Sequence, residues 1–245
     1  MSSTVDIQAV DRVGRILALF GPGRETVSSA EAADLIGLNR TTTYRYLASL
    51  VAAGILETRP DRTYGPGPTL IQLGSFALGR QNILDLAPEP MSALAQATRI
   101  TAVLSLWGAS SPVVAHVEES SQREIVVTVR VGMHLRSQAA QAIVFQAFST
   151  DPRVRRALRS LPAEERRAVE REVDAVKECG FSGQVSPRGI AVLAVPVYDD
   201  KQMVASLGLL STRDVLDVSG DSPELPQLQR AADSISFAMG QREGT

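Results

Sequence analysis

Residues 27–47 read VSSAEAADLIGLNRTTTYRYL, and this stretch decides the fold of the N-terminal third. We predict a short helix that ends at Ile36, a tight turn at Gly37 and a second helix capped by Asn39, because glycine accepts a left-handed turn and asparagine is a preferred N-cap. Two helices joined in this way form a helix-turn-helix. In that motif the N-terminal part of the second helix enters the major groove of DNA.

The second helix has two unlike sides. Thr43, Leu47, Leu50 and Gly54 recur at three- and four-residue spacing and are predicted to face the core. The other side carries side chains that bond phosphates and base edges, namely Arg40, Thr41, Thr42, Tyr44 and Arg45. Arg45 is the best candidate for a bidentate contact with guanine. A plain solvated helix face is the alternative, but the preceding helix, the glycine turn and the following hairpin favour DNA recognition.

The segments around this motif complete a DNA-binding domain. An amphipathic helix is predicted over residues 6–20, Ser28 or Ser29 can cap the next helix, and residues 55–65 read as a hairpin, or wing. Arg59 and Arg62 in the turn of the wing are placed for phosphates, although loop arginines are also often simply solvated. The predicted DNA contacts are Ser28, Ser29, Asn39, Arg40, Thr41, Thr42, Tyr44, Arg45, Arg59 and Arg62.

The rest of the chain has the pattern of a mixed α+β domain. A Pro-Gly-Pro break at 66–68 precedes a helix over 69–78 that is apolar on more than half its surface, so a partner subunit or a second domain should cover part of it. Another break is predicted at 85–90 and a short helix at 91–99. Beyond these, strands are predicted at 101–107, 113–117, 125–131, 189–198 and 204–210, and helices at 139–148, 151–160, 162–179 and 224–242.

Composition narrows the class of protein. The 245 residues are 44% hydrophobic with a net charge of −2, so the chain can bury a sizeable core but lacks the basic character of a non-specific DNA binder. A single cysteine excludes an intrachain disulfide, and no apolar run approaches the roughly 20 residues that span a bilayer. No Gly-x-Ser-x-Gly, phosphate-loop or His-Glu-x-x-His motif occurs. We therefore expect a cytoplasmic protein that is not an enzyme, with no metal, no cofactor and no membrane attachment.

Several short motifs, in this order, resemble the IclR family of bacterial transcriptional regulators over roughly residues 8–240. They are Gly-Ile-Leu at 54–56, Tyr-Gly-Pro-Gly at 64–67, Arg-Val-Gly at 130–132, VKECGF at 176–181, IAVLAVPV at 190–197 and VASL at 204–207. The resemblance implies a winged helix-turn-helix domain over 1–67, a linker helix over 68–84, and a GAF-like effector-binding and oligomerisation domain over 85–245. It also implies a homodimer or homotetramer (a dimer of dimers) on palindromic double-stranded operator DNA, with a small organic acid or aromatic catabolite as effector.

The chain departs from the family where the family's effector pocket takes its polar anchors. The loop at 184–188 contains no acid, and the strand positions that often supply polar groups are Val192, Gly208 and Leu210. A less polar pocket predicts an aromatic or partly apolar effector, with a few polar groups that orient it. A closed core without an effector is the alternative. The predicted effector-binding residues are Trp107, Leu135, Gln138, Gln141, Ala142, Arg188, Val192, Gly208 and Leu210.

Two other functions compete with a ligand-responsive transcription factor. The first is an enzyme or a small-molecule-binding protein that uses its helix-turn-helix only to dimerise, but it would need a catalytic constellation that the sequence does not offer. The second is a constitutive architectural DNA-binding protein, which would need more positive charge and no large C-terminal domain.

Overall fold

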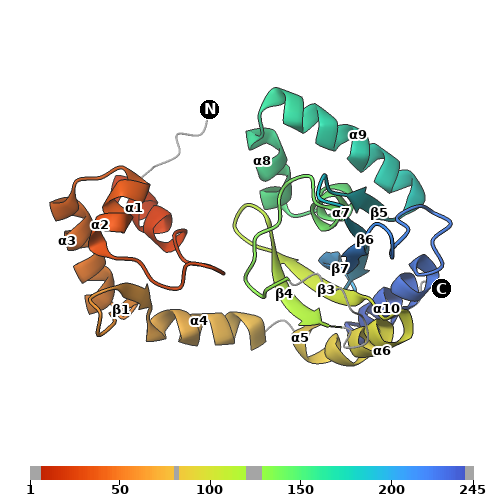
Figure 1. The fold of residues 1–245 in the computed structure, drawn as a ribbon, viewed down its shortest axis with the longest axis horizontal. Helices are drawn as coiled ribbons and strands as arrows, with labels where there is room; N and C mark the ends of the chain where they lie inside the picture. The colour runs from red at the N-terminus through yellow and green to blue at the C-terminus, as the bar shows by residue number, and fades with distance from the viewer. Residues whose placement is uncertain (1–6, 80–82, 120–128, 241–245) are drawn as a thin grey trace. The chain divides into compact units, whose positions relative to one another are not determined.

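The computed structural model describes residues 7–79, 83–119 and 129–240. The chain divides into two compact units, Met1–Gln81 and Asn82–Thr245 (Figure 1). Among the described residues, no helix is both long enough and apolar enough to cross a membrane.

The first unit is a helical domain with a two-stranded hairpin and a trailing helix. Its elements are α1 (Gln8–Leu17), α2 (Ser29–Ile36), α3 (Arg40–Ala52), β1 (Leu56–Thr58), β2 (Tyr64–Pro66) and α4 (Pro68–Gly79). The first three helices and the hairpin share one buried core, which contains Ile16, Val27, Ala32, Ile36, Leu47, Leu50, Leu56 and Tyr64. The helix-turn-helix and wing predicted from the sequence are therefore confirmed.

Local interactions fix the turn between α2 and α3. Gly37 ends α2 in the left-handed conformation, with φ of 67°, which a residue with a Cβ adopts only at a cost. The guanidinium of Arg15 on α1 donates to the carbonyl of Ile36 at the end of α2. Asn39 then caps α3, its side-chain oxygen accepting from the Thr42 amide at 2.8 Å. Together these contacts hold α3 at a set angle to α2.

The wing is joined to the helices by backbone hydrogen bonds. Val27 and Tyr64 exchange two of them, at 2.9 and 2.8 Å, so the segment before α2 pairs with the return strand. The amide of Gly67 donates to the Ile55 carbonyl at 2.8 Å, and the amide of Thr69 donates to the Gly54 carbonyl at 3.0 Å. The start of α4 is thus fixed to the base of the wing.

The second unit is built on one antiparallel sheet with strand order β4-β3-β7-β6-β5. Its elements are α5 (Ile83–Leu86), α6 (Pro88–Thr98), β3 (Thr101–Trp107), β4 (Pro112–Glu118), α7 (Ala140–Phe148), α8 (Pro152–Ser160), α9 (Ala163–Cys179), β5 (Ser182–Val185), β6 (Ile190–Tyr198), β7 (Met203–Thr212) and α10 (Leu225–Ala238). The predicted α+β class is confirmed.

Helices cover both faces of this sheet (Figure 1). Alternate strand residues such as Leu104, Leu193 and Leu207 face α6 and α10, where they form the larger core. The opposite face meets α7, and α9 packs against α7 in a second core around Phe145. The strand residues on this second face decide what the domain can bind.

The structure differs from three of the predictions for the second unit. The break at 85–90 is wrong, because α5 covers Ile83–Leu86 and α6 begins at Pro88, where proline is tolerated in the first turn of a helix. The loop at 184–188 is wrong for its first two residues, which belong to β5 and pair with β6. Of the strand predicted at 125–131, residues 125–128 lie outside the described residues, and 129–131 form no strand.

Candidate functional site

The exposed face of α3 is the first candidate site. Thr43 and Leu47 are fully buried and Leu50 nearly so, as the periodicity predicts. Since successive residues turn by about 100°, Thr41 and Arg45 lie on the opposite side of the helix from this buried row. Both are exposed. A hydroxyl and a guanidinium therefore point outward, one turn apart, near the start of the helix.

Arg45 has the freedom that a DNA-reading side chain needs. Within the described part of the chain, the guanidinium groups of Arg40 and Arg45 make no ion pair and no hydrogen bond. Tyr44 beside them is 57% exposed. The face thus offers donors that are not already committed to the protein, which is the condition for bidentate contact with a base edge.

The predicted contacts at the helix starts also have structural roles. The Ser28 hydroxyl oxygen accepts from the Glu31 amide at 3.2 Å, and a Glu31 carboxylate oxygen accepts from the Ser28 amide at 2.8 Å. This capping box identifies Ser28, rather than Ser29, as the cap of α2. The hydroxyl hydrogen of Ser28 and the side-chain NH2 of Asn39 remain available for a phosphate. A cap and a DNA contact are therefore compatible at both positions.

Replacing Ser28 by alanine is expected to destabilise the first unit by about 1 kcal/mol, because one amide of the first turn loses its partner. The hydrogen bond from the Ser28 amide lowers the pKa of Glu31. The ionised Glu31 carboxylate therefore stabilises the folded state fully above the ordinary pKa of glutamate. This stabilisation is lost as the pH falls through the lowered pKa of Glu31. Thermal unfolding followed by circular dichroism tests this, with Ser29→Ala as the matched control. An equal loss in both variants would contradict the assignment of the cap.

The two wing arginines differ in their surroundings. Arg59 lies 3.1 Å from the carboxylate of Glu57 on the same hairpin. Arg62 is exposed at the tip with a left-handed backbone, φ of 64°, and it has no ion pair among the residues described. Next to it, Asp61 accepts two hydrogen bonds from Thr63, which lower the pKa of Asp61 and fix the turn. Arg62 is thus the better placed of the two for a phosphate.

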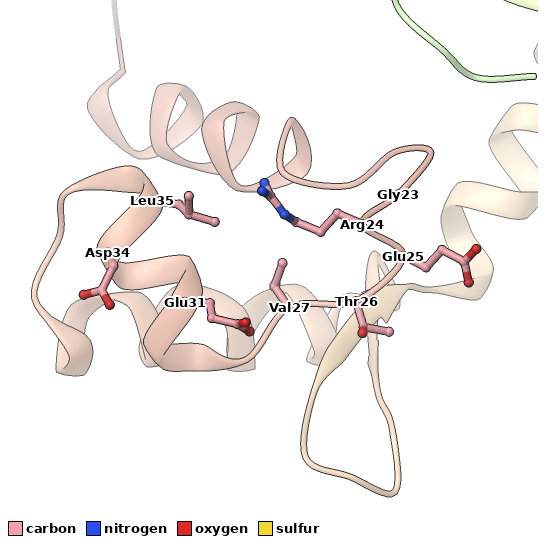
Figure 2. Close-up of a pocket in the computed structure, with 8 residues that line it drawn as sticks. All are labelled: Gly23, Arg24, Glu25, Thr26, Val27, Glu31, Asp34 and Leu35. Atoms are coloured by element: carbon pink, nitrogen blue, oxygen red, sulfur yellow. The ribbon is translucent and has the colours of Figure 1, made fainter. Parts of the chain in front are cut away.

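A hollow beside α2 has the wrong charge for DNA. It is lined by Gly23, Arg24, Glu25, Thr26, Val27, Glu31, Asp34 and Leu35 (Figure 2). Three carboxylates against one guanidinium repel phosphate. Figure 2 shows Glu25 and Asp34 pointing away from each other. No group of three His, Cys, Asp or Glu side chains among the described residues could hold a metal ion.

The second candidate site is the sheet face that meets α7. Leu135, Val192 and Leu210 belong to one apolar cluster there, together with Val103 and Val114. Leu135 reaches the face because the loop before α7 runs along β4, where its amide donates to the Pro112 carbonyl at 2.9 Å. The structure therefore brings together three of the predicted effector contacts that are far apart in the sequence.

Gln141 is held in place at the centre of this face. It is 4% exposed, and its side-chain NH2 donates to the carbonyls of Val103 and Ser206, both at 3.0 Å. Its side chain also lies over Gly208, in the space where a side chain at that position would stand. Both amide hydrogens are used, so Gln141 can offer a ligand only its carbonyl oxygen, which is a hydrogen-bond acceptor.

The other predicted contacts are more scattered. Trp107 packs edge-on against Phe145 with ring centroids 5.4 Å apart, and its buried indole N–H has no hydrogen-bond partner among the residues that the structure describes. Ala142 is fully buried on α7. Gln138 and Arg188 are exposed and belong to none of the apolar clusters described. The apolar contacts thus gather on one face, while two of the three predicted polar contacts do not.

Sequence reasoning missed three residues of this face. Val103 and Val114 are almost fully buried in the same cluster, and Ser105 is fully buried, its hydroxyl having no hydrogen-bond partner within the described part of the chain. The signal for Val103 and Ser105 was the two-residue alternation along 101–107, which places them on one side of the strand with Trp107. Val114 joins them because β4 pairs it with Ser105. The sequence pattern does not show which helix covers that side of the strand.

Each of the two histidines has a ring nitrogen within hydrogen-bond distance of a neighbouring side chain. A ring nitrogen of His116 lies 2.7 Å from the Glu118 carboxylate, and one of His134 lies 3.0 Å from the Ser111 hydroxyl. Neither pair forms part of a nucleophile–base–acid array of the kind that hydrolases use.

Comparison with known proteins identifies a family to which the helix-turn-helix is similar, and a protein that is similar over most of the chain. The family model for the IclR helix-turn-helix domain matches residues 9–60. The DNA-binding transcriptional repressor YiaJ of Escherichia coli (strain K12) is 25% identical over 233 residues, which cover 86% of this chain and 80% of YiaJ.

Solved structures are similar over both units. An IclR transcriptional regulator from Alicyclobacillus acidocaldarius is 25% identical and has a TM-score of 0.72, over 96% of this chain and all of that one. An IclR homologue from Microbacterium hydrocarbonoxydans, solved as a complex with 4-hydroxybenzoate, has a TM-score of 0.73 at 21% identity, over 94% of this chain and 98% of that one. Residues 9–60 thus match the IclR helix-turn-helix domain, and the chain as a whole is similar in sequence and fold to IclR transcriptional regulators.

Proposed function

We propose that the chain is a ligand-responsive transcription factor that binds a palindromic operator as a dimer or a dimer of dimers, with its DNA affinity set by a small, partly apolar effector. The observation that carries the proposal is the exposed face of α3, where Thr41 and Arg45 point away from the buried row of the helix. The wing would add phosphate contacts through Arg62 and, less strongly, through Arg59.

Charge alone does not account for tight binding by one domain. Residues 39–64 contain four arginines against two acids, so their electrostatic attraction to DNA is modest. Two domains on two half-sites would supply the rest. On α4, Ile71 and Leu73 are 68% and 58% exposed, which supports burial of this helix against a second subunit.

Footprinting tests the DNA part of the proposal. The full chain would be added to the DNA upstream of its own gene, with excess random competitor DNA. We expect protection of two half-sites whose centres lie about 34 Å, or one helical turn, apart. Light scattering of the complex should give two or four chains per site. A footprint that spreads without symmetry would count against a palindromic operator.

The effector would lie on the α7 face of the second unit, against Leu135, Val192 and Leu210. Because both amide hydrogens of Gln141 are bound to the backbone, the effector group that meets Gln141 must be a donor, such as a hydroxyl. We propose an effector with an aromatic or aliphatic body and a hydroxyl group. A ligand that binds one arrangement of the subunits more tightly would change the spacing of the two recognition helices through α4.

Leu135→Ala is expected to weaken effector binding about 15-fold, because the loss of about two buried CH2 groups, at about 0.8 kcal/mol each, costs about 1.6 kcal/mol. Operator affinity without effector should not change. Trp107 is the only tryptophan of the chain and packs beside this face, so its fluorescence reports binding directly. The probes are hydroxylated and unhydroxylated aromatic acids.

Val185→Ala is the matched control, since Val185 is 44% exposed and belongs to none of the apolar clusters described. Similar weakening in both variants would show that the effector does not contact Leu135. Tighter binding of the unhydroxylated acids would contradict the role of Gln141.

A further inference from the structure

The helix α8 carries a stripe of arginines that the proposed function does not use. Its nine residues, PRVRRALRS, include four arginines and no acid. In the sequence, residues 82–245 carry 17 Arg and Lys against 20 Asp and Glu. Without the four arginines of α8, this unit has 13 basic residues against 20 acidic residues. The helix is therefore a concentrated positive stripe on an otherwise negative domain.

The packing of α8 sends these arginines outward. Val154 is 2% exposed, and Leu158, one turn later, packs against the core shared by α7 and α9. At about 100° per residue, Arg156 and Arg159 lie on the side of the helix away from this buried pair, and Arg155 lies on its flank. All three are exposed. The face that does not touch the core is thus made of guanidinium groups.

Three of the four α8 arginines have no counter-ion among the residues described. Arg153 lies 2.6 Å from Asp151 and is paired with it. By contrast, Arg155, Arg156 and Arg159 have no carboxylate within 4.0 Å among the described residues. Arg155 reaches only the Thr150 carbonyl, at 3.5 Å. Like charges three and four residues apart destabilise a helix, and the helix dipole favours a cation only in the last turn, at Arg159.

The neighbouring helix shows the ordinary arrangement. The α9 helix contains four basic and six acidic residues, and its ion pairs include Arg166 with Glu170 at 3.8 Å and Lys177 with Asp174 at 3.4 Å. Figure 1 shows α8 leading directly into α9. The absence of acids is therefore a property of α8 and not of the surface around it.

We infer that Arg155, Arg156 and Arg159 form a second DNA-contacting surface, which binds the phosphate backbone of DNA beyond the sequence read by α3. The inference rests on the proposed function, because the winged helix brings the polyanion to the protein. Guanidinium groups remain charged at any physiological pH and pair with phosphate in a bidentate manner. Such contacts carry no sequence information and strengthen binding to longer DNA.

The test compares two lengths of duplex around the footprinted site, one of about 25 base pairs that holds both half-sites and one of about 80. The full chain is compared with the triple variant R155Q/R156Q/R159Q and with the control R166Q/R167Q/R171Q, which removes the same charge from α9. Three phosphate contacts, at about 0.9 each, should lower the slope of log affinity against log salt by about 2.7 per protomer on the long duplex. When the salt concentration rises from about 50 to about 200 mM, wild type should therefore lose about 40-fold more affinity per protomer than the triple variant does.

On the short duplex we expect the triple variant to bind with the same affinity and salt slope as wild type. The α9 control should have the affinity and salt slope of wild type on both duplexes. Unchanged melting temperature and molecular mass would show that the variant is folded and assembled. Equal salt slopes for wild type and the triple variant on the long duplex would overturn the inference. A triple variant of lower oligomeric mass would also overturn it, in favour of an acidic face on a second copy. Failure of wild type to bind the short duplex would instead overturn the proposed function itself.

Discussion

Replacing Arg45 by alanine is expected to weaken binding to the operator by about 1–3 kcal/mol, or about 5- to 150-fold, and to leave binding to random DNA almost unchanged. The reason is geometric. The guanidinium projects from the side of α3 opposite the buried Leu47, and it has no partner among the described residues that it must give up. Removing a bidentate hydrogen bond to one guanine lowers affinity only where that guanine is present.

The measurement is fluorescence anisotropy with the footprinted duplex and with a scrambled duplex, at near-physiological salt. Arg24→Ala is the matched control, because it removes the same charge from the same unit at an exposed position outside α3. Equal weakening by both substitutions would mean that Arg45 acts only through its charge. Unchanged operator affinity in Arg45→Ala would show that α3 is wrongly placed as the reading helix.

Gly67→Ala should have the largest effect on stability, at about 3 kcal/mol, because the added Cβ has no room. It would stand 2.5 Å from the Gly54 carbonyl oxygen and 2.7 Å from the carbonyl group of Leu56, and all of these atoms are backbone. The base of the wing and the start of α4 would have to move apart. Operator affinity should fall with the melting temperature of the first unit.

Gly74→Ala is the control for this change. Gly74 lies within α4 with open space around its Cα, so alanine there should raise stability by about 0.5–1 kcal/mol. Differential scanning calorimetry of the full chain separates the two cases, since the second unit should unfold at the same temperature in both variants. A Gly67→Ala protein as stable as wild type would mean that the wing and α4 are not joined as described.

Local sequence signals predicted the first unit well because its structure is set locally. Asn39 as an N-cap, Gly37 as a left-handed turn and the spacing from Thr43 to Leu50 each act within one or two turns of helix. The α3 contacts follow from the same spacing. The prediction that Gly54 belongs to the core-facing row of this helix was wrong, because α3 ends at Ala52 and Gly54 is left-handed, and the pairing of Arg59 with Glu57 was not foreseen.

The second unit was harder to predict because its contacts are between distant residues. The short strand β5 consists of Ser-Gly-Gln-Val, a pattern that favours no strand until β6 pairs with it. Gln141 could be named as polar and central, but its bonds to Val103 and Ser206 depend on the order of strands in the sheet. The exposure of Gln138 and Arg188 likewise depends on loop paths that the sequence does not encode locally.

The most direct test of sequence reading by α3 combines a change in the protein with a change in the DNA. Wild type and Arg45→Ala would each be titrated against operator duplexes in which single guanines are replaced by 7-deazaguanine, which lacks the N7 acceptor. We predict that wild type loses affinity at one guanine in each half-site, and that Arg45→Ala is indifferent to the same replacement. If the variant loses as much affinity as wild type at every guanine, the two changes act independently, and Arg45 does not read the operator.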